Sequence, residues 1–394
     1  MNEDGNDGVN WDVIVVGAGI TGASTAYHLR KRGLRVLLLE RGEPASGGTG
    51  RSAAIIRQHY STPLLVRLAR ASIDLLRAMP DEFGRDGGYR AAGYCFLVPA
   101  DMMEGARRNV AMQHALGIDT GFFSLDDAAR HLPELNSDGV AGVIYEPLGG
   151  YADPVQSTES YVAGFLRDGG ELLRRTAARA LLRTGDRITG VLTDAGPLAA
   201  GWVVNAAGPW AKPLAESAGL DLPLRSVREQ DTIWEIPPGR PIPAVSISNG
   251  VDAIYLRPLP GRRFVIGRGF PKQYFDVDPY NYKTTADADF VADAQARAER
   301  RFPAFTGMRL IDSYAALYDV TPDWNPFVGP RAGLSGYADA SGGSGHGFKI
   351  GPAIGRELAA WIADGTAADD FCQFSHDRIA LKKMFTGAYG GNRA

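Results

Sequence analysis

Three glycines and one glutamate near the N-terminus have the types and spacing needed to hold an adenine dinucleotide. The glycines are Gly17, Gly19 and Gly22 of a GxGxxG motif, and Glu40 follows 18 residues after the last of them. Gly17 is expected to make a tight turn, Gly19 to let the backbone approach a pyrophosphate, and Gly22 to allow a helix to pack closely on a strand. The positive end of that helix would face the phosphates, and the Glu40 carboxylate would accept hydrogen bonds from a ribose.

The elements around this motif are those that would position it. Residues 11–16 are an apolar run typical of a buried strand, residues 20–32 are expected to form a helix that Gly33 ends, and residues 35–39 are expected to form the second strand. A GxGxxG motif alone is weak evidence, but a strand–helix–strand unit with an acidic residue at its end is specific. Ile20, Thr21 and Arg41 are therefore also expected to contact the dinucleotide.

Two later segments carry further glycine motifs. Residues 201–210 predict a strand that ends in Ala-Ala-Gly, which would bring a second stretch of backbone to the dinucleotide. Residues 341–349 read Ser-Gly-Gly-Ser-Gly-His-Gly-Phe-Lys and precede a helix expected to begin near Gly351. The loop at 41–52 is too small and flexible for the third strand that an NAD-binding unit would need.

Together these motifs resemble the D-amino-acid-oxidase-type FAD oxidoreductases, and most of all their sarcosine oxidase and dimethylglycine dehydrogenase branch. The resemblance covers nearly the whole chain in the family's order, and it implies FAD rather than NAD. It also places the backbone near Ala178 beside the adenine. The further cofactor contacts that it implies are Ala207, Gly208, Gly345, His346, Gly347 and Lys349.

The scattered cofactor motifs imply an α/β flavoprotein of two domains. Residues 1–85, 145–218 and 317–394 are expected to form a discontinuous, Rossmann-like FAD-binding domain. Residues 86–144 and 219–316 carry alternating strand patterns and are expected to form an inserted antiparallel-sheet substrate domain. Ligands should meet where the two domains join.

The resemblance also implies a carboxylate-binding pair above the flavin. Lys349 matches the lysine that holds the substrate carboxylate in this branch, and Arg57 of Ile-Ile-Arg matches its arginine partner. Tyr255 matches a residue that lines the substrate pocket. The alternatives are surface positions for Arg57 and Lys349 and an ordinary half-buried strand tyrosine at Tyr255. The loop 342–347 would stabilise negative charge on reduced flavin, or would serve only to reverse the chain.

Two departures from the branch change what is expected. Ala316 stands where monomeric sarcosine oxidases carry the cysteine that attaches FAD, and residues 47–54 lack the histidine used by dimethylglycine dehydrogenases, so FAD should be bound non-covalently. Val265 stands where the branch has a lysine that activates dioxygen, with Arg268 three residues later. The electron acceptor therefore stays open between dioxygen and a partner protein.

Composition excludes several other classes of protein. A formal charge of −3 and a pI near 6.1 argue against nucleic-acid binding. Two cysteines, Cys95 and Cys372, exclude a disulfide framework, and the histidine spacing predicts no metal site. The acidic N-terminus is unlike a signal peptide and no apolar run approaches the ~20 residues of a membrane span, so a cytoplasmic protein is expected.

We therefore expect FAD-dependent oxidation of the C–N bond of an amino acid, with a secondary or N-methylated amine as the favoured substrate. Hydride transfer to flavin N5 would give an imine. One alternative is a tailoring oxidase or dehydrogenase with a larger, dedicated biosynthetic substrate. The other is a non-catalytic subunit that binds FAD for structure.

Overall fold

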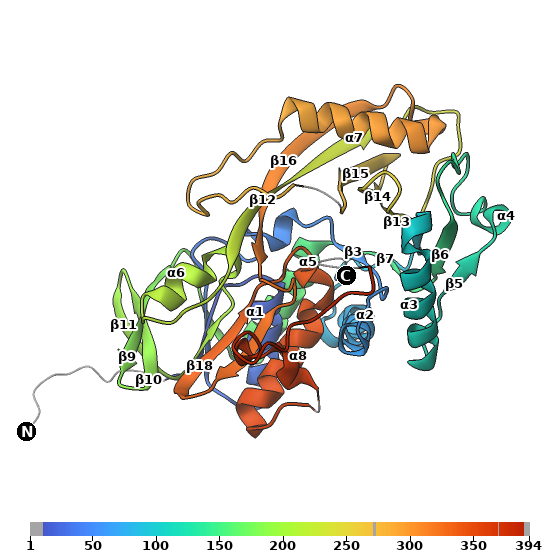
Figure 1. The fold of residues 1–394 in the computed structure, drawn as a ribbon. Coiled ribbons are helices and arrows are strands. Elements are labelled where there is room, and N and C mark those ends of the chain that lie inside the picture. The colour runs from blue at the N-terminus through green and yellow to red at the C-terminus, as the bar shows by residue number, and fades with distance from the viewer. Residues whose placement is uncertain (1–10, 271–272, 369, 390–394) are drawn as a thin grey trace, which may run out of the picture.

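Two large sheets organise the chain, which a computed structural model describes for residues 11–270, 273–368 and 370–389. The segments 1–10 and 390–394, which the sequence analysis assigned to the FAD-binding domain, lie outside the described residues. The first sheet lies with α1, α5 and α8 in the lower half of Figure 1, and the second lies with α7 in the upper half.

The first sheet is built around β1 (Trp11–Val16). It lies between β11 (Gly196–Asn205) and β2 (Val36–Leu39), parallel to both, and β8 (Glu171–Leu173) adds a further parallel strand beside β2. All of β1 is buried except Asp12, as expected for a parallel strand covered on both faces. The remaining strands of this sheet are β9 (Ala178–Thr184), β10 (Arg187–Thr193), β17 (Phe327–Arg331) and β18 (Leu334–Ser341).

Helices cover one face of this sheet and a β-meander covers the other. The helices are α1 (Ile20–Lys31), α2 (Pro63–Phe83), α5 (Pro154–Arg167) and α8 (Gly347–Asp364). Strands β9, β10 and β11 form this antiparallel meander. Its residues Leu181, Ile188 and Val191 are buried against the face of β1 and β2 that the helices leave free. This arrangement confirms the expected α/β fold with a Rossmann-like unit.

The last helix begins four residues earlier than the sequence indicated. Helix α8 starts at Gly347 rather than near Gly351, so Lys349 lies in its first turn. Gly351 and Gly355 are packing positions rather than helix breakers, because a Cβ at Gly351 would lie 2.9 Å from Thr21 Oγ1 and one at Gly355 would lie 2.5 Å from Ser24 Cβ. The absence of side chains there lets α8 pack closely on α1.

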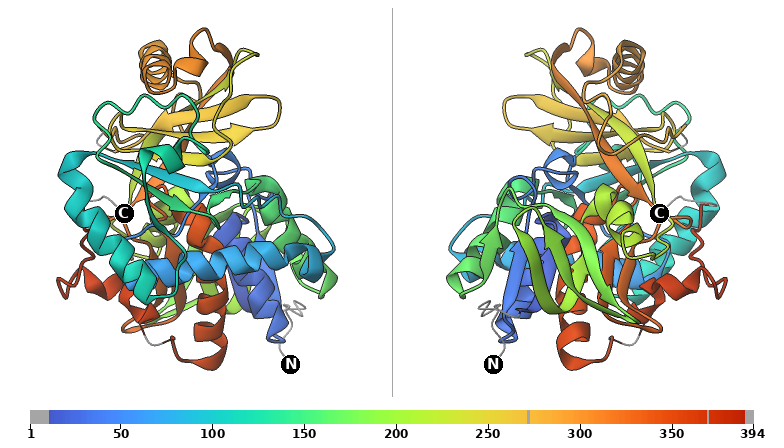
Figure 2. Two further views of the ribbon diagram at one scale, coloured as in Figure 1. Left: turned by 90° about the vertical axis from the view of Figure 1, so that its right-hand side faces the viewer. Right: turned by 90° about the vertical axis from the view of Figure 1, so that its left-hand side faces the viewer.

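The second sheet has the strand order β16-β12-β15-β14-β13-β4-β6-β5. Its pairs are antiparallel except for β13 and β4, which are parallel. Helix α7 (Ala288–Arg301) packs on its outer face (Figure 2). The core between them includes Phe264, Phe302 and Phe305. The strands are β4 (Tyr94–Val98), β5 (Gly121–Phe123), β6 (Gly142–Glu146), β12 (Arg225–Glu235), β13 (Ser246–Asn249), β14 (Ile254–Leu259), β15 (Arg263–Arg268) and β16 (Arg309–Val320).

The inner face of the second sheet is directed toward the first sheet and its helices, and β12 lines a cavity together with residues of β1 and α1. The predicted division into two domains remains a prediction, and its boundaries at 145 and 317 fall inside β6 and β16. The smaller elements are β3 (Ile55–Ile56), β7 (Gly150–Tyr151), α3 (Met103–Ala115), α4 (Leu125–Ala128) and α6 (Ala211–Glu216). Across the described part of the chain, no helix has both the length and the hydropathy of a membrane crossing.

Candidate active site

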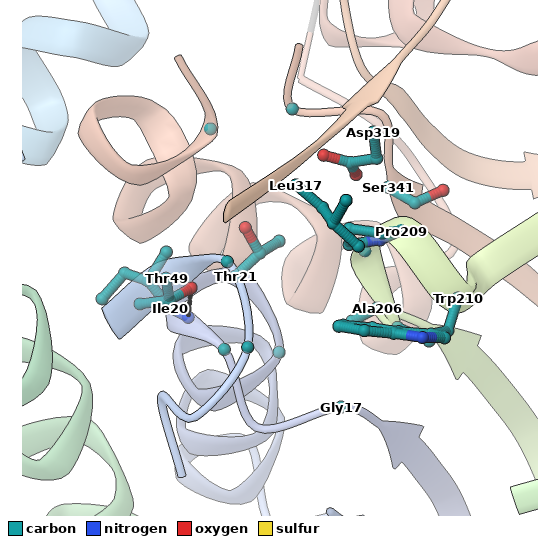
Figure 3. Close-up of a pocket in the computed structure, with 18 of the residues that line it drawn as sticks. Gly17, Ile20, Thr21, Thr49, Ala206, Pro209, Trp210, Leu317, Asp319 and Ser341 are labelled. Carbon is teal, nitrogen blue, oxygen red and sulfur yellow. Dashed lines mark hydrogen bonds between the residues drawn. The ribbon is translucent and has the colours of Figure 1, made fainter. Parts of the chain in front are cut away.

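The dinucleotide-binding end of the fold lies where β1, α1 and β11 meet. Gly17 has a φ of +102°, and a Cβ there would lie 2.5 Å from the carbonyl oxygen of Ala206. A Cβ at Gly22 would lie 1.9 Å from the carbonyl oxygen of Gly17, so neither glycine can be replaced without moving backbone. The turn brings the N-terminus of α1, with Ile20 and Thr21, to a cavity whose opposite side carries Ala206, Pro209 and Trp210 (Figure 3).

Glu40 follows β2 and lines the same cavity. One carboxylate oxygen accepts the Ala18 N–H at 2.8 Å, and the other accepts the Gly42 N–H at 2.8 Å. Beside it, the Arg41 guanidinium lies 3.7 Å from the centre of the Trp210 ring. The two N–H groups hold the carboxylate where an adenosine ribose would need an acceptor.

The loop after Glu40 contributes a group that sequence reasoning missed. The Ile20 N–H at the start of α1 donates to Thr49 Oγ1 at 3.2 Å, and a Cβ at Gly19 would lie 2.9 Å from the same oxygen. Residues 46–49 and 51–53 line the cavity with small and polar groups. The run of Ser, Gly and Thr in this loop was the available signal, because hydroxyls beside a helix N-terminus suit a phosphate.

The first cavity has a volume of about 430 Å³ and runs from Glu40 to the first turn of α8. It also contains Ala316 to Asp319 of β16, and Asp319 Oδ2 accepts the Gly342 N–H at 2.6 Å. Most of the expected cofactor residues line it, but His346 and Lys349 line a second cavity instead. Those in the first are Gly17, Gly19, Ile20, Thr21, Gly22, Glu40, Arg41, Ala178, Ala207, Gly208, Gly345 and Gly347.

The donors and acceptors of this cavity fit FAD. The fixed Glu40 carboxylate suits a ribose, and the N-terminus of α1 suits the pyrophosphate. At the far end, the first turn of α8 lines the cavity through Gly347 and Phe348, and a helix N-terminus favours negative charge. The residues of the loop 46–53 that line the cavity would also contact the cofactor.

A second cavity of about 240 Å³ adjoins the first and contains Arg57, Lys349 and Tyr255 together. These three residues come from the segment after β3, from α8 and from β14. The residues common to both cavities are Ser52, Ala53, Tyr318 and Gly345. Groups predicted from motifs far apart in the sequence thus meet beside the cofactor cavity.

Arg57 and Lys349 line this cavity without forming an ion pair with any residue that the structure describes. Arg57 donates to the backbone oxygen of His59, and its guanidinium lies 4.5 Å from the centre of the Tyr60 ring. Burial, with a further contribution from the positive charge of Arg57, lowers the pKa of Lys349 well below its ordinary value. Within the described residues, neither side chain forms an ion pair, so the cavity is electrostatically suited to an anion.

A carboxyl group missed by sequence reasoning lies behind Arg57. Glu146, the last residue of β6, is fully buried and accepts the Gln58 N–H at 2.6 Å. Burial raises the pKa of its carboxyl to about 7, although the Gln58 N–H and the Arg57 charge act in the opposite direction. A glutamate at the end of the apolar run Gly-Val-Ile-Tyr was the signal for a buried carboxyl group.

Tyr255 is held by a second carboxylate that the sequence analysis did not identify. Its hydroxyl donates to Asp231 Oδ1 at 2.7 Å, and the bond crosses Gly267 of the strand between them. A Cβ at Gly267 would lie 2.3 Å from the Tyr255 hydroxyl oxygen and 2.4 Å from Asp231 Oδ1. Asp231 and Glu229 alternate along β12 and line the first cavity, so the inner face of this sheet is acidic beside the cofactor site.

The two histidines of the second cavity are neutral. Burial is the main cause that lowers the pKa of His59 to about 3 and that of His346 to about 3. His346 Nε2 lies 2.6 Å from the Trp324 carbonyl oxygen and Nδ1 lies 3.4 Å from the Tyr60 hydroxyl. No group of three or more His, Cys, Asp or Glu side chains among the described residues could hold a metal ion.

The positions that depart from the sarcosine oxidase branch lie as follows. Ala316 lines the first cavity, while the side chain of Cys95 is buried in the second sheet. Val265 is buried on the same face of β15 as Gly267. Arg268 lines the second cavity and forms an ion pair with Asp293 of α7.

Comparison with known proteins places this geometry in a family. The family described as DAO, FAD dependent oxidoreductase, matches residues 12–361. Sarcosine oxidase subunit beta of Arthrobacter sp is 28% identical over 94% of this chain and 91% of its own length. The 4-methylaminobutanoate oxidase (formaldehyde-forming) of Paenarthrobacter nicotinovorans is 28% identical over 91% of this chain, which spans only 44% of that longer protein.

Solved structures agree with this assignment. The crystal structure of L-proline dehydrogenase from P. horikoshii superposes with a TM-score of 0.88 at 26% identity, covering 95% of this chain and 99% of that one. The family predicted from the motifs, its sarcosine oxidase branch and the FAD cofactor are thereby confirmed. This chain belongs to the DAO family of FAD-dependent oxidoreductases and is an enzyme that oxidises amines or amino acids.

Proposed function

We propose that this enzyme oxidises the C–N bond of a secondary or N-methylated amino acid. The observation that carries the proposal is the pair of half-buried cations, Arg57 and Lys349, in a cavity that adjoins the cofactor cavity. The named substrates of the three relatives support it, because sarcosine, 4-methylaminobutanoate and L-proline each combine a carboxylate with a secondary amine.

Arg57 and Lys349 would hold the substrate carboxylate. The guanidinium presents two parallel donors and the ammonium a point charge, so together they fix both the position and the direction of the carboxylate. Binding places a negative charge next to Lys349. This charge raises the pKa of the lysine, opposite to the effect of the Arg57 charge, and so stabilises its protonated form. The substrate carbon that carries nitrogen would then face the common boundary of the two cavities.

The second cavity also favours the reactive form of the substrate. Burial disfavours a charged amine, and the neutral His59 and His346 add no charge that would oppose loss of the amine proton. FAD, when bound, supplies the acceptor for the hydride equivalent that leaves the substrate carbon. The nitrogen lone pair becomes part of the C=N bond, and the imine product hydrolyses in water. No residue is assigned as a general base.

Two subsidiary proposals concern the cofactor. FAD is held non-covalently, since Ala316 carries no nucleophile; acid precipitation should therefore release all of the flavin into the supernatant. The acceptor remains either dioxygen or a partner protein. Val265 supplies no charge to stabilise developing superoxide, and the charge of Arg268 is balanced by Asp293, which favours a slow reaction with oxygen.

An anaerobic absorption titration of the FAD-loaded enzyme tests the main proposal. Sarcosine, proline, pipecolate, glycine and D-alanine would be added in turn while the flavin band is followed. Bleaching by a secondary amino acid is expected, and admission of air then separates an oxidase from a dehydrogenase. A flavin that none of these compounds reduces would contradict the proposal and favour a larger dedicated substrate or a non-catalytic subunit.

A further inference from the structure

The C-terminal segment returns to the substrate cavity. Tyr389 lines the second cavity together with Arg57 and Lys349, although it lies 40 residues after the lysine in the sequence. No motif of the chain pointed to this tyrosine, which is the last residue that the structure describes.

Tyr389 is seated by specific contacts. Its hydroxyl meets His59 Nε2, and the two rings are stacked with centroids 5.9 Å apart and an interplanar angle of 25°. The edge of Phe96 packs against the same ring at 5.9 Å. A Cβ at Gly105 of α3 would lie 2.9 Å from Tyr389 Cδ1, so this glycine provides room for the ring.

The segment that carries Tyr389 is anchored near the cofactor end of β16. The Phe385 N–H donates to Asp323 Oδ2 at 3.2 Å, and the Phe385 ring stacks on Phe374 at 5.4 Å. Asp323 is itself held by the Arg378 guanidinium through two bonds of 2.8 Å, in a pair whose side chains are 3% and 2% exposed. A buried ion pair therefore holds Phe385, which lies four residues before Tyr389, and fixes where the segment can reach.

We propose that Tyr389 is a specificity-determining residue that forms one wall of the substrate cavity and limits the size of the group attached to the carboxylate-bearing carbon. The inference rests on the proposed carboxylate site. The ring stands on the side of the cavity that contains His59, the residue whose carbonyl oxygen accepts from Arg57. A substrate held by Arg57 must therefore place its substituents beside this ring.

The proposal predicts a change in selectivity rather than a general loss of binding. Tyr389→Ala removes the ring and opens space next to the clamp. Tyr389→Phe keeps the ring and removes only the hydroxyl group, with its contacts to His59 and Asn109. Leu381→Ala is the matched control, because Leu381 lies in the same segment and is 60% exposed. All three would be purified with FAD bound.

The test is a titration of each holoenzyme with acetate and with phenylacetate, followed by the change in flavin absorption. The ratio of the two dissociation constants should shift at least about tenfold toward phenylacetate in Tyr389→Ala, an effect of about 1.4 kcal/mol. It should stay within about threefold of wild type in Tyr389→Phe and Leu381→Ala, which is less than 0.7 kcal/mol on the same scale. A ratio unchanged in Tyr389→Ala, with acetate still bound, would overturn the inference. Failure of both acids to bind wild type would overturn the carboxylate site, and this inference with it.

Discussion

Replacing Lys349 by Met should weaken substrate binding without loss of FAD. The methionine roughly keeps the length of the side chain and removes a charge from the cavity. Truncating one partner of a buried charge pair costs about 2–5 kcal/mol. The lower part of that range is expected here, since Lys349 and Arg57 repel each other in the free enzyme and the variant relieves this repulsion. A loss of about 2–3 kcal/mol raises KM about 30- to 150-fold.

The pH dependence of carboxylate binding gives a second, independent result. Lys349 binds an anion only when protonated, and burial followed by the Arg57 charge lowers the pKa of the lysine. Binding should therefore weaken as pH rises through this lowered pKa. In Arg57→Met the repulsion is gone, the pKa of Lys349 rises, and the loss of binding should move to higher pH.

The assay is titration of the FAD-loaded enzyme with acetate at a series of pH values, together with steady-state kinetics on the best substrate. Lys383→Met is the matched control, because that lysine is exposed on the C-terminal segment, and its KM should equal that of wild type. A KM within twofold of wild type in Lys349→Met, or an unshifted pH profile in Arg57→Met, would refute the reasoning.

Three further predictions concern Glu146, Glu40 and the ion pair between Arg378 and Asp323. The pKa of the Glu146 carboxyl is raised from 4.5 to about 7. Wild type should therefore lose stability relative to Glu146→Gln as the pH rises from about 4.5 to about 7. Equal slopes of Tm against pH for the two proteins would contradict this. Glu40→Ala should weaken FAD binding about 10- to 100-fold, because it removes an acceptor worth about 1.5–3 kcal/mol. Glu43→Ala is the control, since Glu43 forms surface ion pairs, and it should leave FAD binding unchanged. Equal FAD affinities of the two variants in a fluorescence titration would contradict the role of Glu40 in FAD binding. Arg378→Gln should lower the free energy of unfolding, measured in urea, by about 3–5 kcal/mol, because it leaves the buried Asp323 carboxylate without its cation. A loss below about 1 kcal/mol would show that this carboxylate does not depend on Arg378.

Local sequence signals were sufficient for the cofactor cradle. The turn at Gly17, the close packing at Gly22 and the acidic residue at the end of β2 depend on neighbours within one strand–helix–strand unit, and spacing alone specifies them. Local signals did not locate the start of α8. Gly347 was expected in the preceding loop, whereas it begins the helix. The glycine at 351, expected at the start of the helix, instead serves the close contact with α1.

The surroundings of the proposed substrate depend on register between distant segments. The contact of Tyr255 with Asp231 requires Gly267 to lie between them in the sheet, which no spacing within β12 or β14 reveals. Glu146 reaches the Gln58 N–H, next to Arg57, only because β6 ends beside that segment, and Tyr389 reaches His59 from the far end of the chain. Such groups become visible only after the strands are paired.

The central claim is that a carboxylate clamp presents a secondary amine to FAD. Its most direct test compares the rate of anaerobic flavin reduction by sarcosine with that by sarcosine amide, which keeps the amine and loses the carboxylate. The clamp predicts fast reduction by sarcosine and at least about 30-fold slower reduction by the amide at low concentration, equivalent to about 2 kcal/mol. Equal rates for the two compounds would contradict the account.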